Sequence, residues 1–269
     1  MPEPSCVFDH AILAVADLAA ACARFERLGF MLSPRGQHRS RGTANACIML
    51  PNGYLELLAA DGPGCIETFL LEFLGFGEGL CSLALAPDDS ARVHALLTTW
   101  GAANGEPVVG GRAMETPEGA RDVRFRICRV AGRPVLPGRV FFCEHLDRDT
   151  VYAPHLLRHA NGARAIGGMS VLGDPAEVID PARAAALGLC RVETPGATVL
   201  HAGTVPLRIT AGGSRPTGQM SAPDLLMVTP DPSLIARAAA ADGLPVVAAG
   251  RSVRVTLHGM DLVLVPPGD

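Results

Sequence analysis

One pattern recurs four times along this chain and limits the folds that it can adopt. Each copy has a short apolar strand, a turn with aspartate or proline, an Ala/Leu-rich helix, and two or three further strands. The copies begin near residues 8, 80, 166 and 224. Such a period indicates one supersecondary unit used several times, because a single unit cannot bury its own apolar face. The sequence therefore predicts four βαβββ modules.

The first copy shows the pattern most clearly. It opens with the strand and turn HAILAVADL and continues into the helix AAACARFERLGF. The apolar positions that share one face of this helix are Leu18, Ala21, Cys22 and Phe25. Gly29 stands where a C-terminal cap is expected. Two strands follow, TANACIML and YLELLAA, joined by the turn PNG.

The other copies repeat this order with different residues. The second begins at LCSLALAPDD, and its helix is SARVHALLTTWG, with Ser90 as the expected N-cap and Gly101 past the end. Its later strands are DVRFRICRV and RVFFCEHL. The third and fourth copies begin at IGGMSVLGDP and DLLMVTPDP. In each copy aspartate or proline stands between strand and helix, as helix starts require.

The modules are expected to work in pairs. Two βαβββ units side by side can curve their strands into a half-barrel with a central cleft, which is an α+β fold. We expect a first domain over residues 1–150, with modules at about 8–60 and 79–147. Residues 151–164 are the expected linker, and residues 165–269 are expected to form a second, degenerate pair of modules.

Composition excludes several classes of partner. The net charge of −4 gives no reason to expect a nucleic acid, and no apolar run reaches the roughly 20 residues of a membrane span. The N-terminal stretch has no basic region typical of a signal peptide. The eight cysteines are scattered without a C-x-x-C pair, which favours reduced thiols. The sequence predicts a cytoplasmic protein with a small-molecule ligand, as a monomer or a homodimer.

Two parts of the first half resemble a known superfamily. The stretches FDHAILAVADLAAACARFERLGF, GTANACIML and GYLELLAA resemble the opening module of the vicinal oxygen chelate superfamily, and within it the glyoxalase-like proteins. The later VFFCEHLDRDTVYAPHLLRHANGA is similar to the end of that subgroup's second module. The resemblance implies a divalent metal that chelates two neighbouring substrate oxygens, with ligands from the first and last strand of each module.

Carried over residue by residue, the resemblance implies a metal site of His10, Glu56 and Glu144, with the two glutamates also catalytic. Such a set suits manganese, iron, nickel or zinc. The plainer interpretation of His10 is a hydrogen-bonded histidine near a strand end. The second module departs from the pattern, because Cys81 stands where a histidine or glutamine is expected. Cys81 is either a thiolate ligand or a small buried apolar residue.

Four further residues are candidates for substrate binding. Arg124 and Arg126 share one strand face and would favour an anionic substrate if that face lined the cleft; a solvated face is the alternative. Asn45 is either a donor to a substrate oxygen or a turn residue. His145 is the fourth candidate, and only one of it and Glu144 can face the cleft, because neighbours on a strand point to opposite sides.

Two hypotheses of function remain open. The first is a metal-dependent enzyme of the lyase, isomerase or dioxygenase type that acts on a small oxygenated, anionic substrate. The second is a metal-free protein that binds or sequesters a small molecule in the same cleft. Cys81 in place of a histidine favours the second. In the second half the strands GMSVLG, VPLRIT, DLLMVT and DLVLVP contain Arg208 as their one ionisable residue apart from flanking aspartates, so no metal is expected there.

Overall fold

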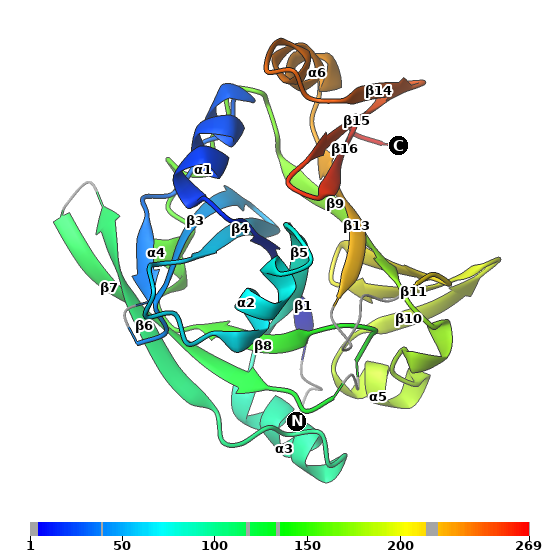
Figure 1. Cartoon of the computed structure of the whole chain (residues 1–269). Coiled ribbons are helices and arrows are strands. Elements are labelled where there is room, and N and C mark those ends of the chain that lie inside the picture. Colours follow the sequence, from blue (N-terminus) through cyan, green and yellow to red (C-terminus); the bar gives the residue numbers. More distant parts are fainter. Residues whose placement is uncertain (1–4, 39, 117–118, 133–134, 214–219, 269) are drawn as a thin grey trace.

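The computed structural model describes residues 5–38, 40–116, 119–132, 135–213 and 220–268. Residues 1–4, part of the N-terminal stretch without a basic region, lie outside these ranges. The chain forms a long curved sheet with short helices packed along it (Figure 1). Within the described ranges, no helix is long and apolar enough to span a membrane.

The elements follow the predicted fourfold order. The first module contains β1 (Cys6–Ala14), α1 (Leu18–Arg27), β2 (Gly36–His38), β3 (Thr43–Leu50) and β4 (Gly53–Ala60). The second contains β5 (Gly79–Pro87), α3 (Ser90–Thr99), β6 (Val108–Thr116), β7 (Gly119–Arg129) and β8 (Val140–His145). Two short helices, α2 (Thr68–Leu74) and α4 (Arg148–Val151), follow the first and second modules.

The second half repeats the same order with shorter strands. The third module contains β9 (Ala165–Leu172), the 3₁₀ turn η1 (Pro175–Glu177), α5 (Pro181–Ala186), β10 (Cys190–Thr194), β11 (Ala197–Ala202) and β12 (Val205–Thr210). The fourth contains β13 (Ser221–Val228), α6 (Pro232–Ala241), β14 (Val246–Ala249), β15 (Ser252–Leu257) and β16 (Met260–Val265). The prediction of an α+β fold of repeated βαβββ modules is confirmed.

An aspartate begins each module helix. Its carboxylate accepts a hydrogen bond from a backbone N–H in the first turn, which satisfies a donor that the helix leaves free. The four caps are Asp17, Asp89, Asp180 and Asp231. The expectation that Ser90 caps the second helix was wrong by one residue. Ser90 is the first helical residue, and its hydroxyl is free to donate to Glu144.

Strand pairing is the same in every module. The first strand pairs in parallel with the last, as in β1–β4, β5–β8, β9–β12 and β13–β16. Two modules then join through their first strands, which run antiparallel in β1–β5 and β9–β13. One bridge, between Leu80 of β5 and Ala222 of β13, links the two halves into one sheet.

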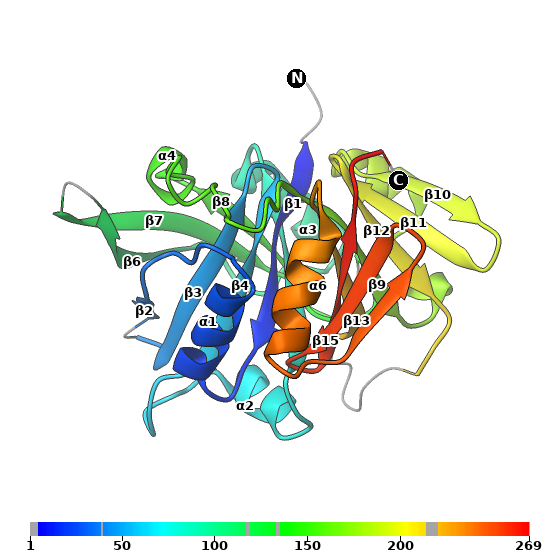
Figure 2. The ribbon, with the colours of Figure 1, turned by 90° about the horizontal axis from the view of Figure 1, so that it is seen from above.

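The main core lies between the sheet and the helices. In α1 the residues Leu18, Ala21 and Phe25 are buried, as the helical spacing predicts. The helices α1 and α6 lie side by side in Figure 2, and Arg24 and Arg27 of the first pair with Asp242 after the second. The apolar core spans both halves, so the opposite, concave face is the one that a ligand can reach.

Candidate functional site

A pocket opens on the concave side of the first two modules. It holds about 750 Å³, including its open mouth. One wall is apolar and consists of Val123, Phe125 and Ile127 of β7 with Phe141 of β8, whereas the rest combines histidines, glutamates and arginines with further apolar side chains. A concave, largely apolar site with a few polar groups is the usual form of a small-molecule site.

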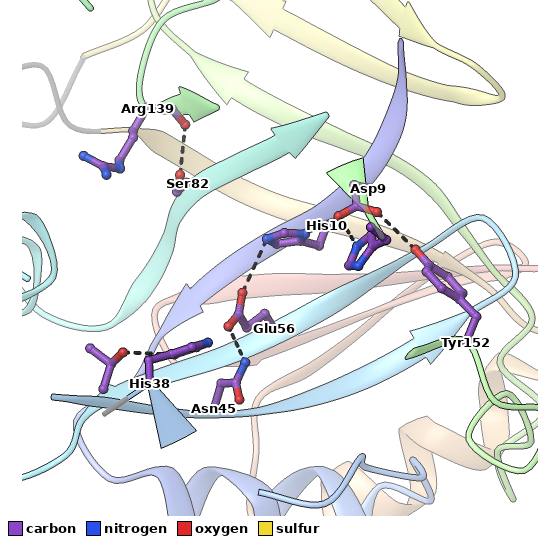
Figure 3. Close-up of polar contacts among 10 residues, drawn as sticks. Asp9, His10, His38, Asn45, Glu56, Ser82, Arg139 and Tyr152 are labelled. Atoms are coloured by element: carbon purple, nitrogen blue, oxygen red, sulfur yellow. Dashed lines mark hydrogen bonds and ion pairs between the residues drawn. The ribbon is translucent and has the colours of Figure 1, made fainter. Parts of the chain in front are cut away.

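A chain of five polar residues crosses the floor of this pocket, four of them buried and His145 partly buried. The chain runs from His145 through Asp9, His10 and Glu56 to Asn45, and Figure 3 shows the last four of these side chains close together. His145 Nε2 and His10 Nδ1 lie 2.9 Å and 2.7 Å from Asp9 Oδ2. His10 Nε2 lies 3.4 Å from Glu56 Oε2, and Asn45 Nδ2 donates to Glu56 Oε1 at 2.6 Å. We call this set the polar chain.

A β-bulge brings Asp9 and His10 together. Neighbouring strand residues normally point to opposite faces, but the β1–β5 register shifts between Phe8 and His10, so that Asp9 is an extra residue in β1. A bulge of this kind turns a side chain to a new direction and is common beside active sites. Asp9 can therefore hydrogen-bond to its own neighbour, His10.

Asp9 sets the protonation of both rings. Burial alone would raise its pKa, but the contacts with His145 and His10 outweigh burial and hold the pKa of Asp9 below its usual range. An ionised carboxylate only accepts, so the ring nitrogens that face it carry hydrogen. His10 is thus protonated on Nδ1 and directs Nε2 at Glu56, and His145 is protonated on Nε2.

Two tyrosines hold this arrangement in place. Tyr152, just after α4, donates its hydroxyl to Asp9 Oδ1 at 3.3 Å. The ring of Tyr54 stacks on His10 with centroids 4.5 Å apart. Burial, followed by the charge of Asp9, raises the pKa of Tyr54 well above its usual value, so its hydroxyl stays protonated. Both contacts restrict the rotation of the groups that they touch.

Three of the candidate residues from the sequence lie away from the pocket. Glu144 points to α3, where it accepts from Ser90 and pairs with Arg126 Nη1 at 2.9 Å. Arg124 pairs with Asp147 at 2.9 Å on the outer surface. His10, Glu56, Asn45 and His145 do line the pocket. The structure therefore brings four of the seven candidates together and does not bring Glu144 to the expected metal ligands.

The expected correspondence of Cys81 with His10 is one residue off. His10 stands seven residues before the aspartate that caps α1, and Ser82 stands seven before the one that caps α3. The pairing of β1 with β5 supports the equivalence of Ser82 and His10, because β5 has its own extra residue at Cys81, as β1 has at Asp9. Cys81 packs in an apolar cluster beneath α2, and burial raises its pKa to about 12. It is a protonated thiol outside the pocket.

The last strand of the second module, like its first strand, has no metal-ligating residue at the position equivalent to the one in the first module. Glu56 lies beside Ile12 in the β1–β4 pair, and Phe141 lies beside Ala84 at the equivalent place in β5–β8. The ring of Phe141 meets His10 edge-on, with centroids 5.6 Å apart. A metal centre with ligands from the first and last strand of both modules would thus have Ser82 and Phe141 at two positions. The residues present do not fit that centre.

A different group of ligand atoms lies close together at the other end of the polar chain. Asp9, Cys143 and His145 each offer one ligand atom, and these atoms lie within 4.8 Å of one another. Burial raises the pKa of Cys143 well above its usual value, and His145 donates to Asp9. The three residues form a possible metal site, which an ion could occupy if the thiol and the ring nitrogen gave up their protons.

Sequence reasoning missed two important residues of the site, one buried behind the pocket and one in its lining. Asp9 was overlooked because strict alternation would point it away from His10. Arg112 of β6 lines the pocket and is only 8% exposed. It lies directly opposite Val123 in the β6–β7 pair, so it shares the apolar face of β7. The alternation of Val123, Phe125 and Ile127 was the signal that could have identified that face.

Comparison with known proteins agrees with this architecture. A family model described as a glyoxalase-like domain matches residues 8–187. A hypothetical protein from Staphylococcus aureus has a similar fold, with 14% identity, a TM-score of 0.68, and coverage of 97% of this chain and 99% of that one. No curated protein matches the chain significantly.

Two enzymes also share the fold at low identity. A triple mutant of 4-hydroxymandelate synthase from Streptomyces coelicolor is 11% identical, with a TM-score of 0.62 and coverage of 99% and 93%. A fusion of a xylose isomerase-like TIM barrel with 4-hydroxyphenylpyruvate dioxygenase is 15% identical, with a TM-score of 0.52; 99% of this chain matches 50% of the fusion. These likenesses concern the fold. The family model covers most of the chain, and the chain therefore belongs to the glyoxalase-like family, as its resemblance to the vicinal oxygen chelate superfamily predicted.

Proposed function

We propose that this chain is an enzyme that moves a proton beside a carbonyl group of a small oxygenated substrate, in a lyase or isomerase reaction. The observation that carries the proposal is the arrangement of Asp9, His10 and Glu56 at the pocket floor. A general base must lie within reach of its substrate and of a group that receives or orients its proton. Glu56 meets both conditions, because it lines the pocket and faces His10 Nε2 at 3.4 Å.

Each member of the polar chain then has a role. Glu56 removes the proton, and Asn45 orients the carboxylate by donating to Oε1. His10 takes the proton from Glu56 on Nε2, and the imidazolium is stabilised by Asp9, which faces Nδ1. This is the relation of base and orienting carboxylate found in catalytic triads. Arg112 adds positive charge to the pocket, which favours the negative charge that develops on a substrate oxygen.

Hydrogen–deuterium exchange tests this proposal without knowledge of the natural substrate. Pyruvate and pyruvamide have exchangeable methyl protons beside a ketone, and proton NMR in D₂O follows their loss. We expect the protein to accelerate exchange on at least one of the two. Glu56→Gln should reduce the acceleration by about 100-fold or more. The matched control is Glu144→Gln, which changes a glutamate outside the pocket and should retain the rate.

The outcomes are distinct. Acceleration that Glu56→Gln removes and Glu144→Gln retains supports the proposal. Equal rates in the two variants contradict it, and so does a protein that accelerates exchange on neither compound. A protein that binds the compounds without exchange would instead be the metal-free binding protein that the sequence left open.

A metal-dependent enzyme is the second candidate, favoured by the close ligand atoms of Asp9, Cys143 and His145. Its cofactor would be a divalent ion such as zinc, manganese, iron or nickel, whose chemistry is Lewis-acid activation of a substrate oxygen. Elemental analysis of protein purified without chelator tests it. Stoichiometric metal that is lost in His145→Ala and kept in Glu144→Gln would support this candidate. No metal after loading with each of the four ions would rule it out.

A further inference from the structure

Three buried polar atoms of pocket residues have no hydrogen-bond partner among the described residues: Arg112 Nη1, Asn45 Oδ1 and His145 Nδ1. The first two lie against Gly36, in residues that are 8% and 3% exposed. Both residues line the pocket. Buried polar groups are almost always paired, and one left alone costs free energy. Two of them side by side therefore indicate a ligand group that pairs with both.

The hydrogen bonds fix which atom of Asn45 is free. Glu56 as a carboxylate only accepts, so the amide nitrogen of Asn45 must face it, at 2.6 Å. Figure 3 shows the amide oxygen turned away from Glu56. The pocket thus presents one acceptor, Asn45 Oδ1, and one donor, Arg112 Nη1. Glu56, bound to the other end of Asn45, supplies negative charge close to Arg112.

Gly36 of β2 lets Asn45 Oδ1 and Arg112 Nη1 lie directly against its backbone. A Cβ at this position would overlap Asn45 Oδ1 and lie 2.6 Å from Arg112 Nη1. The backbone of Gly36 is not in the left-handed region, so its conformation does not require glycine. Glycine suits this position because it has no side chain. The same overlap also shows that the donor, Arg112 Nη1, and the acceptor, Asn45 Oδ1, are near neighbours.

We propose that Arg112, Asn45 and Gly36 form a subsite for a primary amide or ureide group of the substrate. The carbonyl oxygen of that group accepts from Arg112 Nη1, and its N–H donates to Asn45 Oδ1. A carboxylate would accept a hydrogen bond from Arg112, but its second oxygen would face Asn45 Oδ1, and both of these atoms only accept. This unfavourable contact lets the site reject a carboxylate. The assignment rests on the proposed function, since it names the group next to the carbon that Glu56 deprotonates.

Calorimetry with benzamide and benzoate tests the subsite directly. Both probes place a phenyl ring against the apolar wall and differ only in the polar group. We expect benzamide to bind the wild type at least about tenfold more tightly than benzoate. Gly36→Ala and Arg112→Leu should each remove this preference. Arg124→Leu, a change on the outer surface, should keep it, and circular dichroism checks that each variant is folded.

The result can separate the subsite from the proposed reaction. Benzoate binding as tightly as benzamide, or no benzamide binding, overturns the subsite, as does a preference that survives both Gly36→Ala and Arg112→Leu. Proton exchange on pyruvate and pyruvamide at equal rates would retain the enzyme and overturn the subsite. An amide preference in binding without any exchange would retain the subsite and overturn the proton-transfer function.

Discussion

The two halves of this chain are built from the same module but differ in how the faces of their strands are covered. In the first half nearly every residue of β1, β3 and β4 is buried, so both faces of these strands are covered. In the second half the residues of β12, β13, β15 and β16 alternate between buried and partly or fully exposed. The concave face of the second half is therefore open. A βαβββ pair by itself provides a curved surface, and not a pocket.

Additions to the module account for the closed pocket. The strands β6 and β7 have 9 and 11 residues, whereas β10 and β14, the shortest strands of the second half, have 5 and 4. The long strands supply the apolar wall, and α2 and α4 contribute Phe69 and Val151 to the lining. Among the described residues, the second half has no α-helix beyond the one in each module. Length and added helices thus create the site.

The same positions also hold different residues. Asp224 stands seven residues before the cap of α6, as His10 does before the cap of α1. Asp224 lies beside Asp261 in the β13–β16 pair, and His10 lies beside Tyr54 in β1–β4. Two residues after Asp261 stands Val263, where the first half has Glu56. The fourth module therefore lacks the imidazole and carboxylate pair at these positions.

The largest expected difference between the halves is in stability. Asp9→Ala leaves His10, His145 and Tyr152 without their shared acceptor in a buried place, which should cost about 3 kcal/mol of unfolding free energy. Asp224→Ala removes a half-buried carboxylate with one unpaired oxygen and should change stability by less than about 1 kcal/mol. Urea unfolding of both variants measures this. Equal losses of unfolding free energy in the two variants would mean that the polar chain stabilises the protein no more than Asp224 does.

A substitution in the second module can supply the metal-ligating residue that its last strand lacks. Phe141→Glu places a carboxylate at the position equivalent to Glu56, facing His10. We expect its affinity for zinc or manganese to exceed that of the wild type at least tenfold, about 1.4 kcal/mol. Phe141→Gln, with a similar size and no charge, is the control. Calorimetry with the metal alone measures the difference, and an unchanged affinity would refute the equivalence of Phe141 and Glu56.

Asp9, in the first half, should also make the unfolding free energy depend on pH. The folded state holds the pKa of Asp9 below the unfolded value of about 3.9. Its contribution is thus complete above about pH 5 and declines as the pH falls through the unfolded value toward the folded one, by at most about 1.4 kcal/mol per pH unit. Urea unfolding at pH 5, 4 and 3 should show a steeper decline for the wild type than for Asp9→Ala. The exposed carboxylates cancel in this difference, so parallel curves would contradict the prediction.

The sequence predicted the fold well because its signals are local and repeated. Helical spacing, an aspartate or proline before each helix, and glycines after it recur in four copies, and each copy supports the others. The site was less predictable, because a single bulge changes which face a residue occupies. The extra residue Asp9 joined His10 on one face, and Cys81 shifted the correspondence in β5 by one position.

Strand alternation also left two choices that could not be made from the sequence. In β7 either the arginines or the apolar residues could face the cleft, and in β8 either Glu144 or His145. The apolar residues face inward because the long strands and added helices cover that side, where Val123 of β7 and Phe141 of β8 pack in two small apolar clusters. Glu144 consequently turns outward to Arg126. These choices depend on contacts distant in the sequence, which a single strand does not reveal.

The smallest prediction concerns what the halves share. Asp17→Ala in the first half and Asp180→Ala in the second each remove a carboxylate that accepts from a first-turn N–H. Each should therefore lower the unfolding free energy by about 1 kcal/mol, whereas asparagine at either position should have little effect. Urea unfolding of the four variants measures this. If the loss at Asp180 were absent, the second half would depend on its helix caps less than the first, and the difference between the halves would extend from the concave site to the module itself.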